Sequence, residues 1–184
     1  MRLQEKYQKQ VVPAMKEKFG YSSAMAVPKI EKVVVNSGFG SRVAGESSSQ
    51  REKTEKNILD YLALITGQRP ARRRAKKSIS SFHLRKGMTV GATITLRGKR
   101  MYDFLERLIH LTLPRKRDFR GIPLKSITYQ GDLTVGFREL TPFPEVKIDR
   151  EKQVFGLEVT VVTTANSREE AIGLFRMMDF PLQK

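Results

Sequence analysis

The chain has 184 residues, enough for a substantial hydrophobic core, and a hydrophobic content of 39% argues against general disorder. It contains no cysteine, which excludes disulfides, thiolate metal sites and cysteine nucleophiles. Its formal net charge of +16 indicates an anionic partner, because like charge at this density destabilises a compact state. We therefore expect a nucleic acid, an acidic membrane surface or an acidic protein.

The first fifty residues predict a helix, a strand and a loop. Apolar residues at i+4 spacing predict a helix over 3–19, ended by Gly20 and kinked or split at Pro13. The β-branched run over 29–36 predicts a strand. Residues 40–53 are polar and rich in serine, so we predict a mobile loop there.

A helix, a basic segment and a second strand follow. Ser49 and Glu52 have the spacing of a capping box, which predicts a helix from Ser49 to Gly67. Residues 69–86 hold eight Lys and Arg and no acid, and we predict an extended basic loop over 71–87. The strand after it alternates, with an apolar face of Met88, Val90, Ala92, Ile94 and Leu96 and a polar face of Thr89, Gly91, Thr93 and Thr95.

The second half predicts two helices and two strands. An amphipathic helix over 101–112 should stop at Pro114. Strands are predicted over 133–139 and 156–164, and Ser167 with Glu170 caps a final helix. We find no internal repeat, so the prediction is one α+β domain over 1–184, with a mostly antiparallel sheet and helices packed on one face. The other sheet face and the basic loop remain available for RNA.

Motifs for catalysis and nucleotide binding are incomplete. The Gly-rich segment after residue 37 has Val43 where a dinucleotide fingerprint needs glycine, and Glu46 where a P-loop needs lysine. Neither His83 nor His110 has carboxylates at metal-ligand spacing, and no serine lies in a nucleophile motif. The sequence therefore predicts no enzyme, no cofactor, no metal site and no small-molecule substrate.

The basic segment is a candidate nucleic-acid-binding segment. A solvated charged loop is the simplest interpretation, but Ser and Phe82 lie between the cations, and a helix and a strand flank the segment directly. A loop beside a face of small residues suits irregular RNA better than a DNA groove. The alternatives are generic RNA binding or an anionic membrane surface. Against the membrane, the basic run has few apolar residues, and no membrane span or signal-peptide core is present.

Several segments together carry a family resemblance: KIEKVVVNSGFG, ALITGQRP, RAKKSISSFHLRKGMTVGATITLRG, MYDFLERL, LPRKRDFRG, FPEV and VTTANSREEA. Over nearly its whole length the chain resembles bacterial-type large-subunit ribosomal protein five, the family that binds 5S rRNA. The resemblance implies a structural protein in the central protuberance, cytoplasmic and ribosome-bound, on a bacterial or an organellar ribosome. The implied partners are 5S rRNA, 23S rRNA, peptidyl-site tRNA and a small-subunit head protein across the intersubunit bridge.

The resemblance also implies site residues. The family's 5S-contacting positions match Asn36, Gln68 and Thr95, to which we add Lys32, Arg69 and Thr93 as neighbours. The family's peptidyl-site loop matches residues 74–85, with predicted tRNA contacts from Arg74, Lys76, Lys77, Ser78, His83 and Arg85. General rRNA or bridge contacts are predicted for Arg115, Arg117 and Arg120.

Three departures mark a divergent member of that family. Residues 127–132 read ITYQGD where the family has an F-D-G-R-G-N stretch, Arg73 stands in place of threonine, and the connection between Asn36 and Gln68 is longer. The second departure makes the basic loop more basic.

Overall fold

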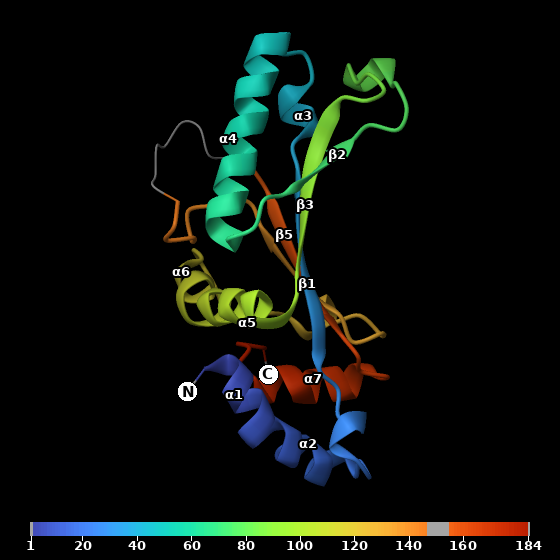
Figure 1. Cartoon of the computed structure of the whole chain (residues 1–184), viewed down its shortest axis with the longest axis vertical. Coiled ribbons are helices and arrows are strands. Elements are labelled where there is room, and N and C mark those ends of the chain that lie inside the picture. Colours follow the sequence, from blue (N-terminus) through green and yellow to red (C-terminus); the bar gives the residue numbers. More distant parts are fainter. Residues whose placement is uncertain (1, 147–154, 184) are drawn as a thin grey trace. The chain divides into compact units, whose positions relative to one another are not determined.

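The computed structural model describes residues 2–146 and 155–183 (Figure 1). It has a five-stranded sheet with the order β2-β3-β1-β5-β4, accompanied by helices, which confirms the α+β prediction. The strands are β1 (Ile30–Gly38), β2 (Ala71–Arg74), β3 (Thr89–Leu96), β4 (Leu133–Phe137) and β5 (Leu157–Thr163).

The chain divides into two compact units. The first comprises Met1–Val34, Leu96–Val135 and Val159–Lys184, and the second comprises Val35–Thr95 and Gly136–Glu158. All the strands except β2 contribute residues to both units. The helices of the first unit include α7 (Arg168–Met177), and those of the second include α3 (Gly40–Val43) and α4 (Ser48–Thr66).

Proline interrupts two helical segments of the first unit in the same way. The π-helical turn η1 (Tyr7–Val11) separates α1 (Leu3–Lys6) from α2 (Val12–Phe19), and η4 (Leu108–Thr112) separates α5 (Gly98–Arg107) from α6 (Leu113–Arg115). In each case a proline follows within two residues of the π turn, at the start of the next helix. Proline cannot donate the α-helical hydrogen bond to the residue four before it, so the wider turn absorbs the mismatch. The break at Pro13 is confirmed; the predicted stop at Pro114 is wrong, because the chain continues helically to Arg115.

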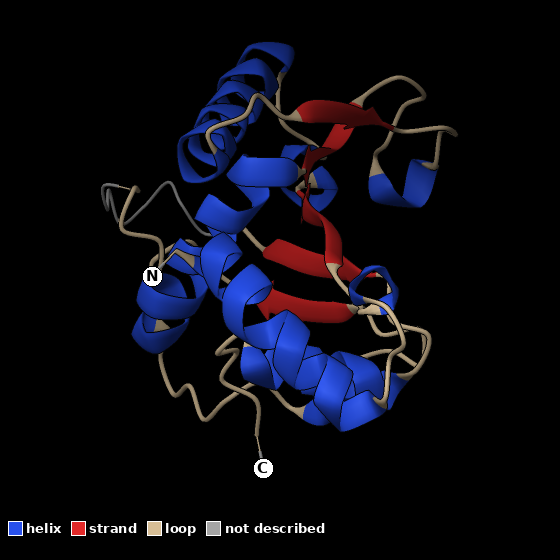
Figure 2. Ribbon diagram, turned by 60° about the horizontal axis from the view of Figure 1, so that its bottom comes forward, coloured by secondary structure: helices blue, strands red, loops and turns tan. Residues whose placement is uncertain are grey.

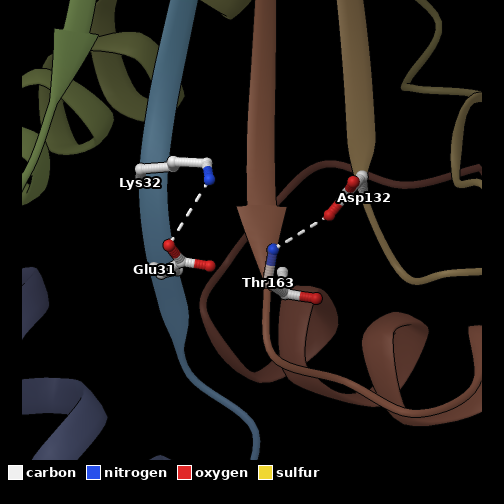
Figure 3. A network of polar contacts seen from close by, with 4 residues as sticks. All are labelled: Glu31, Lys32, Asp132 and Thr163. Carbon is white, nitrogen blue, oxygen red and sulfur yellow. Dashed lines mark hydrogen bonds and ion pairs between the residues drawn. The ribbon is translucent and has the colours of Figure 1, made fainter.

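The divergent segment 127–132 forms a tight turn in the first unit. Asp132 accepts a hydrogen bond from the Thr163 backbone N–H (3.1 Å) (Figure 3). The Thr163 hydroxyl also donates to the Gly131 carbonyl (2.9 Å). Gly131 has φ +89°, and a Cβ there would lie 2.9 Å from the Ala165 Cβ. This segment therefore fixes β4 to β5, and only a glycine fits at position 131.

In the second unit, residues 40–53 differ from the predicted loop. They hold α3 and the beginning of α4, so the loop prediction is wrong except for residues 44–47. The N-cap of α4 is Ser47, whose hydroxyl accepts from the Gln50 N–H (3.4 Å), and not Ser49 as predicted. The predicted helix end is confirmed, since Gly67 takes the left-handed conformation (φ +69°) that closes helices.

The predicted extended loop over 71–87 is partly a β-hairpin. Its first four residues form β2, which pairs antiparallel with β3, and the short helical turn η3 (Ser80–Phe82) lies near the tip (Figures 1 and 2). Strand β1 also extends two residues beyond its predicted end, to Gly38. The other predicted strands and the final capped helix are confirmed, with Ser167 accepting from the Glu170 N–H (3.3 Å).

Candidate nucleic-acid interface

The pairing of β2 with β3 gives the second unit two chemically different sheet faces. Arg72 lies opposite Ala92, and Arg73 lies opposite Gly91. Opposed residues of an antiparallel pair share a face, and neighbours along a strand alternate. Ala92 is buried, and the Arg72 guanidinium reaches Glu55 of α4 (Nε–Oε1 2.7 Å), so this is the face that α4 covers. Arg73 therefore lies on the opposite face.

That opposite face carries a chain of polar contacts across three strands. Arg73 Nε on β2 donates to the Thr93 Oγ1 on β3 (3.2 Å). The Thr93 hydroxyl donates in turn to the Asn36 Oδ1 on β1 (2.8 Å). Thr95 lies two residues after Thr93, so it shares this face. We call the side chains of Asn36, Arg73, Thr93 and Thr95 the polar face.

The contacts within the polar face leave several donors unused. Asn36, Thr93 and Thr95 are all half-buried, so their side chains are held by the sheet yet reach solvent. Within residues 2–146 and 155–183, the structure gives no partner for the Asn36 amide nitrogen or for the Thr95 hydroxyl. Since the fold already uses the Asn36 oxygen, its NH₂ group is the part that can donate to a ligand.

Gln68 is fixed at one end of the polar face. It follows the closing Gly67 of α4, and its backbone carbonyl accepts from the Thr66 hydroxyl (3.1 Å). Its side-chain Nε2 donates to the Thr95 backbone carbonyl (3.3 Å). The structure thus brings Gln68 beside Thr95 and Asn36 beside Thr93, four of the six residues predicted for 5S rRNA.

The other two predicted 5S residues lie elsewhere. Arg69 lines, together with Arg72 and acidic side chains of α4, a cavity of about 930 Å³ on the α4 side of β2. Lys32 belongs to the first unit, where its ammonium group lies 3.4 Å from the Glu31 carboxylate on the same strand (Figure 3). Neither is one of the four side chains of the polar face, although Lys32 alternates with the buried Val33 and so points to the same side of β1 as Asn36.

The backbones of β1 and β3 approach closely beneath the polar face. A Cβ on Gly91 would lie only 2.9 Å from the Ser37 carbonyl oxygen, a distance that real side chains do not show. Gly91 is buried, and the Ser37 hydroxyl donates to the Gly156 carbonyl (2.8 Å). Glycine is therefore required at position 91 so that Asn36 and Thr93 come within hydrogen-bond distance.

The predicted tRNA-contacting loop, residues 74–85, has internal hydrogen bonds. Ala75 donates to the Met88 carbonyl (2.8 Å) and accepts from the Gly87 N–H (2.9 Å), which closes its base. Ile79 and Leu84 exchange two backbone hydrogen bonds nearer the tip, of 3.0 and 3.1 Å. His83 adopts the left-handed conformation (φ +51°) that lets the chain reverse between them.

The cations of this loop have no acidic partners among the described residues. Arg74, Lys76, Lys77 and Arg85 are exposed, and none belongs to an ion pair within that part of the chain. The loop also exposes Phe82, whose accessible fraction is 64%. The Ser78 oxygen accepts from the Lys86 N–H (2.9 Å), which leaves the Ser78 hydroxyl hydrogen free to donate. These groups together suit phosphates and bases.

The predicted bridge residues Arg115, Arg117 and Arg120 lie in the first unit and are exposed. Arg117 Nε lies 3.8 Å from the carboxylate of the adjacent Asp118, and both side chains are about nine-tenths accessible, at 91% and 90%. Such a pair adds little stability in water, so the three arginines remain available to an anion.

The structure shows, over its described ranges, no group of three or more His, Cys, Asp or Glu side chains that would hold a metal ion. None of the helices in those ranges has the length and apolar character that crossing a membrane requires.

Sequence reasoning does not place Arg73 on the polar face. The segment ARRR does not alternate in polarity, so the sequence predicts a loop there, to which Arg73 contributes only charge. Only its register against β3 shows that neighbouring arginines point to opposite faces. The sequence signal for a polar surface there is the position of Gly91 and Thr93 on one face of β3, two residues apart.

Comparison with known proteins identifies the family. Residues 23–85 match the family model described as ribosomal protein L5, and residues 89–182 match the model for the C-terminal part of the same ribosomal family. A relative named large ribosomal subunit protein uL5, from Streptococcus agalactiae serotype Ia, is 48% identical over 183 residues, covering 100% of this chain and 98% of the relative. Its namesake from Streptococcus pyogenes serotype M49 is 46% identical over the same shares. The chain therefore belongs to the ribosomal protein L5 family, whose members are structural, non-enzymatic ribosomal proteins, as its motifs predict.

Proposed function

We propose that this ribosomal protein binds 5S rRNA through the polar face of its second unit, together with the neighbouring Gln68. The observation that carries the proposal is the Thr93–Asn36 contact of 2.8 Å, which fixes the Asn36 amide with its donor side unused. A group held in one orientation loses little conformational freedom on binding, so its hydrogen bond to RNA discriminates well. Asn36, Gln68 and Thr95 are uncharged and short, which suits the recognition of a particular RNA shape.

Most of the affinity should come from phosphates, and the net charge of +16 supports this. Cations capture the RNA backbone without regard to sequence, whereas the polar face tests the local geometry. Lys32 and Arg69, which lie outside the polar face, fit the first of these roles. Binding should therefore weaken steeply with salt while the preference for 5S rRNA persists.

We propose that the 74–85 loop contacts a second RNA, the peptidyl-site tRNA. Its hairpin closures hold Arg74, Lys76, Lys77 and Arg85 as an acid-free group, and the Ser78 hydroxyl adds a neutral donor. The exposed Phe82 and His83 at the tip can stack on a base. The exposed arginines 115, 117 and 120 suit 23S rRNA or the bridge to the small-subunit head, in the central protuberance.

A competition gel-shift titration tests the main proposal. The full chain is titrated against labelled 5S rRNA, with bulk tRNA as the competitor, at two salt concentrations. We expect 5S rRNA to remain bound at a large excess of tRNA. If tRNA displaces 5S rRNA in proportion to its phosphate content, binding is only electrostatic and the polar face has no recognition role.

A further inference from the structure

We propose that Arg73 is an additional residue of this chain that binds 5S rRNA. Its guanidinium group would contact one RNA phosphate beside Asn36 and Thr93. The inference rests on the proposed 5S rRNA binding and extends it to a residue that the motifs do not assign to the site. Three observations carry it: the face on which Arg73 lies, the tether on its Nε, and its lack of an acidic partner.

The face follows from the strand register. Arg73 lies opposite Gly91, which has no side chain, so the arginine stem passes over open backbone instead of a neighbouring residue. A Cβ on Gly91 would lie 3.9 Å from the Arg73 Cβ, which is ordinary contact. The guanidinium group is thereby directed along the sheet toward Thr93 and Asn36.

The tether organises the guanidinium group before any RNA binds. Its Nε donates to the Thr93 oxygen (3.2 Å), which fixes the plane of the group. The two terminal nitrogens lie at the exposed end of the side chain and form no hydrogen bond within residues 2–146 and 155–183. Two parallel N–H donors in one plane match two phosphate oxygens, an arrangement that lysine cannot reproduce.

The neighbouring Arg72 shows what a purely structural arginine looks like here. Its Nε lies 2.7 Å from the Glu55 carboxylate on the face covered by α4, so its charge is already compensated. Arg73 has no acid in ion-pair range within the described part of the chain. The uncompensated positive charge of Arg73, beside neutral hydrogen-bond donors, favours the binding of an anionic group. In RNA that group is a phosphate.

The test compares Arg73→Gln with Arg72→Gln in the full chain. The two substitutions remove the same charge from adjacent residues on opposite faces. Binding to 5S rRNA is measured from about 50 to about 200 mM salt, and the slope of log affinity against log salt is extracted. Arg73→Gln should weaken binding roughly tenfold at low salt and lower the slope by about 0.7–0.9, the value for one phosphate. Arg72→Gln should leave the slope unchanged, and Arg73→Lys should restore the slope but not the full affinity.

Each outcome has a distinct meaning. If wild-type protein does not prefer 5S rRNA to competitor tRNA, the proposed function fails, whatever the variants do. If wild-type binding is specific but Arg73→Gln binds with the wild-type slope and affinity, only the role of Arg73 is refuted. A loss of affinity without a change in slope also refutes it, because the contact is then to a base or is structural. Thermal unfolding of each variant shows whether the sheet is retained.

Discussion

Threonine hydroxyls in the second unit differ in whether the fold itself uses them. The Thr66 hydroxyl donates to the Leu62 and Gln68 carbonyls, at 2.7 and 3.1 Å, and so closes α4. The Thr93 hydroxyl links Arg73 to Asn36. The Thr95 hydroxyl has no partner in the described ranges, although its backbone carbonyl accepts from Gln68. Of these three, Thr95 is the one whose hydroxyl can be removed without cost to the fold.

We therefore predict that Thr95→Val weakens 5S rRNA binding about fivefold, the equivalent of one lost hydrogen bond. Valine has nearly the same shape, so the free energy of unfolding should change by less than about 0.5 kcal/mol. Thr93→Val is the contrasting variant, since it also breaks the contacts to Asn36 and Arg73 and should cost about 1 kcal/mol of stability. Urea unfolding and gel shifts measure both. A large stability loss in Thr95→Val would show that Thr95 is structural.

Tyr7 makes the stability of the first unit depend on pH in the alkaline range. Burial, together with the nearby Tyr102, raises the pKa of the Tyr7 hydroxyl to about 12, and that hydroxyl donates to the Pro28 carbonyl (3.1 Å). Below about pH 10 the group is neutral in both the folded and unfolded states, so it adds no pH dependence. Between about pH 10 and 12 only the unfolded state ionises, and stability falls.

We predict that Tyr7→Phe flattens this fall by about 1–2 kcal/mol, a value already reduced for the partial exposure of the side chain. At neutral pH the variant should be less stable by about 1 kcal/mol, because the hydrogen bond to Pro28 is lost. Unfolding measured at intervals from pH 8 to about 12 checks both effects. Tyr129→Phe is the control, since Tyr129 is 87% accessible and should leave the profile unchanged. Parallel profiles for wild type and Tyr7→Phe would contradict the assignment.

At the scale of elements, the contact of β1 with β3 determines the geometry of the interface. Because a Cβ on Gly91 would lie 2.9 Å from the Ser37 carbonyl, Gly91→Ala must push the two strands apart. We predict a loss of about 1–3 kcal/mol in unfolding free energy, with weaker 5S rRNA binding. Gly38→Ala is the matched control, because a Cβ there meets nothing within 4 Å and its φ is not positive. Equal stability of the two variants would show that the strands are not in such close contact.

The 74–85 loop is a separate element, and its charges should serve a separate partner. We predict that reversing Arg74, Lys76 and Lys77 together to Glu spares 5S rRNA binding within about threefold and impairs translation by ribosomes that contain the variant. The control reverses the exposed Lys9, Lys16 and Lys125, which changes the net charge equally. Gel shifts and an in-vitro translation assay give the two measurements. Loss of 5S binding in the loop variant alone would show that the loop belongs to the 5S site.

At the scale of the whole molecule, local patterns predicted the elements that bury one face. The alternation of β3 and the Ser167 cap of α7 were correct, because burial and capping impose short sequence periods. Strand β2 could not be predicted, since all four of its residues are exposed and it owes its conformation to its pairing with β3. The start of α4 was also ambiguous: Ser47 with Gln50 and Ser49 with Glu52 both have capping spacing, and the sequence alone does not choose between them.

The residues of the candidate site could also be predicted only in part from the sequence. Family motifs supplied Asn36, Gln68 and Thr95, and the strand pattern placed Thr93 and Thr95 on one face. The separation of Arg69 from these residues depends on the direction of the chain after α4, and the opposite orientations of Arg72 and Arg73 depend on the register between strands. Both features depend on how distant segments of the chain pair in the fold. Such pairing produces no periodic pattern in the sequence from which it could be predicted.

The link between Asn36 and Thr93 also has a consequence for the order of synthesis, because it joins residues that are 57 positions apart. As the nascent chain grows, Asn36 is synthesised long before Thr93. The edge of β1 that pairs with β3 therefore remains unpaired until β3 is made. A nascent protein therefore has no polar face until β3 has left the exit tunnel and paired. Under the proposed function, RNA binding through this face follows the synthesis of about the first half of the chain, and truncation before Thr93 removes the face entirely.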